Sequence, residues 1–205
     1  VAARLNGSVT YGLEGSIFVA GSAIQWLRDE LMIINSAADT EEIANRVGVI
    51  DNITVVPAFV GLGAPYWNPN TRGAILGLTR GTSKEEITTA TIQSVAFQAY
   101  DLQQAMTDDG ITPGIIRVDG GMASNNWFIQ FLSDVLNIPV ERPKNIESTV
   151  LGVAYLAALS AEILKTTDQI STLWECEKRF EPSMSSDTRE LLLHNWRKAV
   201  NIIQN

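Results

Sequence analysis

The sequence lacks several features that would point to particular classes of protein. Cys176 is the only cysteine among 205 residues, which excludes an internal disulfide and a zinc centre made of several cysteines. A reducing, cytoplasmic setting is therefore expected. No lysine- or arginine-rich run occurs, and 15 basic residues are outnumbered by 23 acidic ones, giving a formal net charge of -8. We therefore expect no nucleic-acid partner.

Long apolar segments are also missing. No apolar run approaches the roughly 20 residues that a membrane-spanning helix needs, so we expect no membrane span. The first residues, VAARLNGSVTYG, lack the apolar centre of a signal peptide and do not begin with methionine, so we expect the chain to be part of a longer protein. The pattern G-x-x-x-x-G-K-[ST] is absent, so phosphate chemistry here would not use a Walker-type loop. The single histidine, His194, is expected to be solvated.

Apolar residues make up 45% of the chain, enough to form the core of a medium-sized domain. Their spacing predicts a helix from residue 16 to residue 31, and Ser83 with Glu86 fits a capping box that would open a long helix. Further helices are expected near residues 41–47, 125–136, 149–164 and 187–205, and strands near 53–56, 114–121 and 138–143. This alternation predicts an α/β layered domain.

The stretch RVDGGMASNNW, residues 117–127, places two glycines and two asparagines where a predicted strand becomes a predicted helix. Ligands of open α/β sheets bind beyond the carboxyl ends of the strands, where helix N-termini offer unpaired amides to anions. Gly120 and Gly121 would allow a ligand to lie against bare backbone, and Asn125 could contact it. A structural interpretation stays open, with the glycines forming a turn and the asparagine capping the helix.

A second candidate lies in the first predicted helix, which contains Gly21 and Gln25. A glycine inside a helix costs about 1 kcal/mol relative to alanine, so it calls for a reason. Contact with a ligand is one reason, and close packing against another helix is the alternative. The loop GLGAPYWNPNTRG, residues 61–73, is too rigid and aromatic for a flexible linker, and either a structural or a functional loop fits its composition.

Four stretches, taken as a set, resemble the C-terminal half of the FGGY carbohydrate kinases in order and spacing. They are YGLEGSIFVAGSAIQWLRD, VPAFVGLGAPYWNPNTRGAILGLTRG, RVDGGMASNNWFIQF and STVLGVAYLAAL. Residues within 73–78 and 86–93 match the C-terminal signature of that family. The resemblance is to the members that transfer the γ-phosphate of ATP to glycerol, with magnesium as cofactor. It implies a ribonuclease-H-like domain of the actin and sugar-kinase superfamily, lacking its first strands.

The resemblance further implies that residues 1–205 are the C-terminal nucleotide-binding domain, and that ATP contacts Gly21, Gln25, Gly121 and Asn125, with Gly120 allowing close approach of the backbone. It implies a partner domain, N-terminal in the same protein, that supplies the glycerol-binding residues and the aspartate base. No catalytic residue and no metal ligand is thus expected in this chain, and the chain alone should be inactive. Homo-oligomers are common in the family.

Two alternatives stay open. The chain could belong to another FGGY kinase, acting on a pentulose or on gluconate, or it could be a non-catalytic nucleotide-binding module that has kept the fold.

Overall fold

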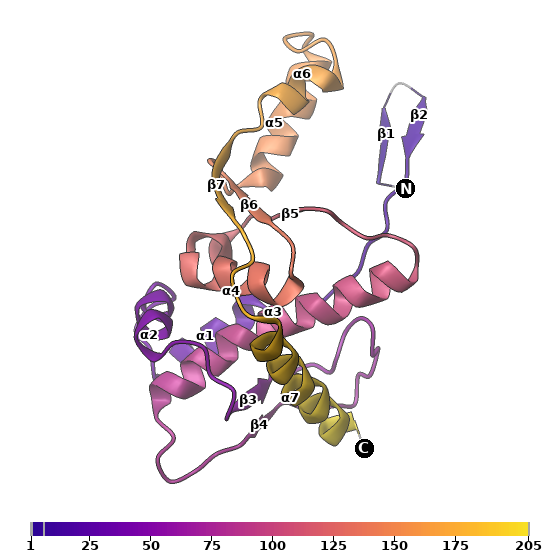
Figure 1. Cartoon of the computed structure of the whole chain (residues 1–205). Helices are drawn as coiled ribbons and strands as arrows, with labels where there is room; N and C mark the ends of the chain where they lie inside the picture. Colours follow the sequence, from indigo (N-terminus) through magenta and orange to yellow (C-terminus); the bar gives the residue numbers. More distant parts are fainter. Residues whose placement is uncertain (1, 6, 205) are drawn as a thin grey trace.

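The computed structural model describes residues 2–5 and 7–204. It contains helices and short strands in an alternating order, which confirms the α/β prediction (Figure 1). The elements in chain order are β1 (Ala3–Leu5), β2 (Ser8–Thr10), α1 (Gly21–Asp29), α2 (Asp39–Val47), β3 (Thr54–Val56), β4 (Ala74–Leu76), α3 (Lys84–Asp108), β5 (Ile116–Arg117), the 3-10 helix η1 (Gly121–Ser124), α4 (Asn126–Leu136), β6 (Val140–Pro143), α5 (Ser148–Ser160), α6 (Thr167–Thr172), β7 (Cys176–Phe180) and α7 (Ser186–Gln204).

The long helix α3 forms the centre of the core. Its predicted capping box is present, because the Ser83 hydroxyl accepts from the Glu86 amide while the Glu86 carboxylate accepts from the Ser83 amide. Helices α1, α2, α4 and α7 and the strand β3 pack against α3. In Figure 1, α7 begins beside the middle of α3 and runs downward from it. Phe97 on α3 contacts the rings of Phe131 on α4 and Trp196 on α7, with centroids 5.6 and 5.5 Å away.

Three small sheets accompany the helices. β1 pairs with β2 and β3 pairs with β4, both antiparallel. The third sheet has the order β5-β6-β7, in which β5 is parallel to β6 and β6 is antiparallel to β7. Ile116 pairs with Val140 in this register. The chain leaves the carboxyl end of β5 and enters η1 and α4, so the glycine pair of the sequence lies at that edge of the sheet.

Helix α5 and the β1-β2 hairpin project away from this core (Figure 1). The helix predicted at residues 149–164 is present as α5, but none of its residues is buried. Val150 and Val153 remain 67% and 65% exposed. The packed interior is therefore built from α1–α4, α7 and the strands they cover. Across residues 2–5 and 7–204, no helix combines the length and the apolar character needed to span a membrane.

The first helix is shorter than predicted. It begins at Gly21, because residues 16–19 are held outside the helix by contacts with distant parts of the chain. The Ala64 amide donates to the Ser16 carbonyl over 3.0 Å, and the Gln98 side chain donates to the Val19 carbonyl over 3.1 Å. Gly21 is consequently the first residue of α1 and not an interior glycine.

Candidate functional site

One cavity of about 520 Å³ brings the two candidate stretches together. Its walls come from α1, from the turn leading into α2, from the first turn of α2, from η1 and from the N-cap of α4. The lining residues are Gly21, Ile24, Gln25, Arg28, Ala37, Ala38, Thr40, Glu41, Gly121, Met122, Ser124 and Asn125. Four of the five predicted site residues thus face a single space, although about a hundred residues separate them in sequence. Gly120, the residue immediately before η1, is not among the lining residues.

Helix α1 forms one wall through residues that share a face. Gly21, Gln25 and Arg28 lie at spacings of four and three residues, so they follow one another along the helix over roughly 10 Å. A β-carbon added to Gly21 would have no heavy atom within 4 Å. Close helix packing therefore does not explain this glycine, and that alternative is wrong. The absence of a side chain instead leaves the N-terminus of α1 open to the cavity.

The two glycines of the turn differ in what they do. Gly120 has φ of +79° and ψ of -179°, a conformation essentially restricted to glycine. Gly121 does not have a positive φ, and a β-carbon there would meet no heavy atom within 4 Å. Gly120 is thus required by the backbone of the turn, whereas Gly121 is exposed and keeps the cavity wall free of a side chain.

Asn125 caps α4, as the structural interpretation of the sequence predicted, and it also contacts α2. Its Oδ1 accepts from the Phe128 amide over 2.8 Å, which caps α4, and its Nδ2 donates to the Thr40 hydroxyl over 3.1 Å. The next residue, Asn126, donates to the Glu41 carboxylate over 2.9 Å. The start of α4 is therefore hydrogen-bonded directly to the start of α2, and these contacts fix the distance between two walls of the cavity.

A short turn before α2 supplies the small residues Ala37 and Ala38. The Asp39 carboxylate holds this turn by accepting from the Ser36 hydroxyl over 2.7 Å and from the Asn35 amide over 2.8 Å. The hydrogen bond from the Ser36 side chain, followed by those from the backbone, lowers the pKa of Asp39 below its ordinary value. The carboxylate is consequently ionised at neutral pH and keeps the turn in place.

Charge in the cavity is of both signs. Arg28 forms an ion pair with its neighbour Asp29, with 2.6 Å between Nε and Oδ1. Glu41 is bound to Asn126 as described above. Ile24, the two alanines and Met122 provide apolar surface between these polar groups. Among the residues described by the structure, no group of three or more His, Cys, Asp or Glu residues could hold a metal ion.

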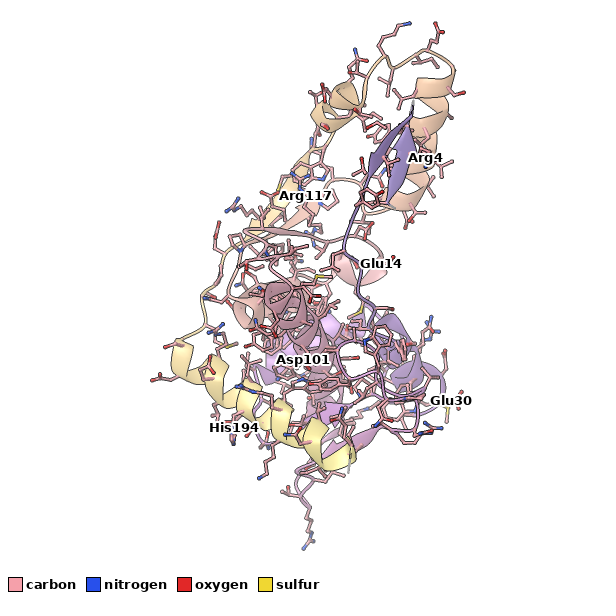
Figure 2. The ribbon with its side chains drawn as sticks, turned by 90° about the vertical axis from the view of Figure 1, so that its right-hand side faces the viewer. Arg4, Glu14, Glu30, Asp101, Arg117 and His194 are labelled. Carbon is pink, nitrogen blue, oxygen red and sulfur yellow. The ribbon has the colours of Figure 1, made fainter. Side chains whose placement is uncertain are left out.

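Other residues noted in the sequence lie elsewhere. His194 is exposed on α7, as predicted (Figure 2). Asp101 on α3, which the sequence did not single out, is buried in the interior (Figure 2). The loop 61–73 does not line the cavity but packs on the core, where the Tyr66 hydroxyl donates to Asp101 over 2.8 Å. A β-carbon on Gly63 would lie 2.5 Å from the Ser16 carbonyl oxygen. The glycines of this loop therefore serve close backbone packing.

Sequence reasoning missed the contribution of α2 to the cavity. Thr40 and Glu41 belong to a polar helix whose sequence carries no ligand-binding signature. Their position depends on hydrogen bonds to Asn125 and Asn126, which are 85 residues away in the chain. No local pattern could have identified them.

Comparison with known proteins places the chain in a family. Residues 2–161 match the profile of the FGGY family of carbohydrate kinases, C-terminal domain. A glycerol kinase from Listeria innocua is 53% identical over 201 residues, which is 98% of this chain and 40% of that protein. The crystal structure of Plasmodium falciparum glycerol kinase with ADP has a TM-score of 0.83 and 33% identity, covering 92% of this chain and 38% of that one.

The fold also extends to more distant members. A ligand-bound xylulose kinase from Lactobacillus acidophilus has a TM-score of 0.75 at 22% identity, and covers 92% of this chain and 38% of that one. The fold is thus that of the sugar kinases, and the chain belongs to the FGGY family of carbohydrate kinases. It spans about 40% of the length of the curated relatives it matches.

Proposed function

We propose that residues 1–205 form the nucleotide-binding domain of a kinase that transfers the γ-phosphate of ATP to glycerol, and that the cavity between α1, α2 and α4 holds the nucleotide. The observation that carries the proposal is the meeting of Gly21 and Gln25 with Gly121 and Asn125 around one space of about 520 Å³. This volume lies within the range of small-molecule sites, roughly 300–1,000 Å³.

The chemistry of the walls suits an adenine nucleotide. Ile24, Ala37, Ala38 and Met122 offer apolar surface for a flat base. The N-terminus of α1, bare at Gly21, carries unpaired amides and the positive end of the helix dipole, which favour a phosphate group. Gln25 projects from the same wall as a donor and acceptor for hydroxyls or base nitrogens.

Glycerol as substrate is supported by the identity to glycerol kinases, 53% for the protein from Listeria innocua. The xylulose kinase at 22% identity supports only a shared fold, so no observation favours a pentulose or gluconate substrate. Under this proposal the part of the relatives' length that this chain does not span supplies the glycerol site and the aspartate base. Phosphoryl transfer depends on positioning and electrostatic stabilisation, so both the nucleotide-binding part in this chain and the glycerol-binding part outside it are needed for catalysis.

Further features belong to the same proposal. Mg²⁺ is usually bound through substrate phosphates, waters and one or two carboxylates, so we expect it to enter with ATP. The family and the single cysteine support a cytoplasmic enzyme of glycerol metabolism. We include assembly into homo-oligomers in the proposal only because homo-oligomers are common in the family.

The test is a calorimetric titration in which ADP or ATP is added to the chain and, separately, to a protein of the relatives' full length that contains it. Gln25→Ala should weaken nucleotide binding in both, because it removes a polar group from the wall of α1. His194→Ala, on the exposed face of α7, is the matched control and should bind like the unmodified protein. Glycerol-dependent ADP formation by the longer protein separates a kinase from a non-catalytic module. Equal nucleotide affinity of the Gln25→Ala and unmodified proteins would contradict the assigned site.

A further inference from the structure

Arg142 on β6 is a buried cation beneath the candidate site. The residue is 8% exposed, whereas its ion-pair partner Glu177 on β7 is 46% exposed in its side chain. Removing a guanidinium from water is costly unless its N–H groups all find acceptors. The acceptors that surround Arg142 therefore indicate which parts of the structure this buried guanidinium holds in place.

Three of the four acceptors belong to η1 and to the first residue of α4. Nη1 of Arg142 donates to the carbonyl oxygens of Ala123 and Ser124, over 2.9 and 3.4 Å. Nη2 donates to Oδ1 of Asn126 over 3.1 Å, and Nε donates to Glu177. One planar fork thus holds the carbonyl end of η1 and the first residue of α4 against the sheet.

The contact with Asn126 continues to Glu41 on α2, which lines the cavity. While Oδ1 of Asn126 accepts from Arg142, its Nδ2 donates to Glu41 on α2 over 2.9 Å. The amide cannot satisfy both partners if it is reversed, because the oxygen would then face Glu41 and the nitrogen would face the guanidinium. Arg142 therefore determines which way this amide points, and with it the link between α4 and α2.

From this geometry we infer that Arg142 is a positioning residue for nucleotide binding: through Asn126 and the carbonyls of η1, it sets the relative placement of the α2 and Gly121 walls. Arg142 is not among the residues that line the cavity. The inference rests on the proposed function, since it assumes that the cavity binds a nucleotide. It adds a buried residue of the sheet to a site otherwise made of helix starts and a turn.

The test measures KM for ATP and KM for glycerol in the protein of the relatives' full length, together with the Kd for ADP. Arg142→Lys keeps the charge beside Glu177 but replaces the fork with one ammonium group. We expect this variant to fold and to raise KM for ATP roughly tenfold, the size of effect that loss of a charge-assisted bidentate contact produces. KM for glycerol should stay unchanged. A general loss of stability would instead lower the apparent kcat, without a selective rise in KM for ATP.

Asn126→Ala removes the relay itself and keeps the experiment decisive if Arg142 variants fold poorly. It should raise KM for ATP by a similar factor, and the double variant Arg142→Lys with Asn126→Ala should be no worse than the poorer single variant, because both changes break one connection. Arg179→Met is the matched control. Arg179 lies in the same sheet on β7 and pairs with Glu141 and Glu181, away from η1, so its loss should leave KM for ATP unchanged.

The outcomes separate the inference from the proposal beneath it. If the unmodified protein binds no ADP, both are wrong. If it binds ADP while Arg142→Lys and Asn126→Ala bind equally well, the inference is wrong and the proposed function stands. Additive effects of the two changes, or an equal effect of Arg179→Met, would also overturn the inference.

Discussion

Gly120 and Gly121 are adjacent, yet substitution should damage different properties of the protein. At Gly120 any L-residue would have to adopt φ near +79° with ψ near -179°. Such a conformation costs about 1–3 kcal/mol, so Gly120→Ala should lower the free energy of unfolding by that amount. At Gly121 there is no positive φ, and a β-carbon has no heavy atom within 4 Å, so Gly121→Val should leave the free energy of unfolding nearly unchanged.

Nucleotide affinity should respond most strongly to Gly121→Val. Its side chain would enter the cavity wall where the proposed nucleotide lies against the backbone. Forcing extra methyl groups into a packed contact costs about 1–3 kcal/mol, which corresponds to a Kd for ADP raised roughly 5- to 150-fold. Gly121→Ala should give a smaller increase in the same direction.

Urea unfolding and calorimetric titration with ADP, done on the same preparations of each variant, check this pair of expectations. Substitution of Gly120 should lower the free energy of unfolding, whereas substitution of Gly121 should raise the Kd for ADP. A folded Gly121→Val variant that binds ADP like the unmodified protein would refute the reasoning. A large loss of stability in Gly121→Val would refute the description of that position as open.

Three further predictions concern the core and the isolated chain. Burial raises the pKa of Asp101 above its ordinary value, even though hydrogen bonds from Trp196 and Tyr66 lower it. The stability that protonated Asp101 contributes is therefore present below the unfolded pKa of about 3.9 and is lost as the pH rises through the folded pKa. The asparagine of the Asp101→Asn variant does not titrate, so its free energy of unfolding, measured with urea, should not show this decline with pH. Tyr66→Phe removes a bond to that carboxylate and should lower the free energy of unfolding by about 1–3 kcal/mol while leaving the Kd for ADP unchanged, as urea unfolding and ADP titration would show. The chain by itself should form no ADP in a glycerol-dependent assay, and steady turnover abolished by Gly121→Val would contradict this.

Features encoded by local chemistry could be predicted from the sequence. The capping box of Ser83 and Glu86 and the cap at Asn125 depend on residues three positions apart, and both are present. The periodic apolar residues likewise predicted the main helices. Within the helix predicted near residues 187–205, Trp196 and Val200 are buried, whereas Leu191 remains 47% exposed and its neighbours Leu192 and Leu193 enter the core instead.

Features set by contacts between distant segments could not be predicted in this way. The start of α1 depends on Ala64 and Gln98, which hold the preceding residues out of the helix. The wall formed by Glu41 depends on Asn126, and the burial of Arg142 depends on a turn 16–19 residues earlier. The predicted site residues were identified by pattern and resemblance, but the cavity they share with α2 became visible only in three dimensions.

A crystal structure with ADP tests the central claim most directly, because the claim is that two segments a hundred residues apart serve one nucleotide. The predicted result is ADP in the cavity lined by Gly21, Gln25, Gly121 and Asn125, touching both α1 and the turn at η1. ADP bound on another surface, or touching one of the two segments but not the other, would contradict the account.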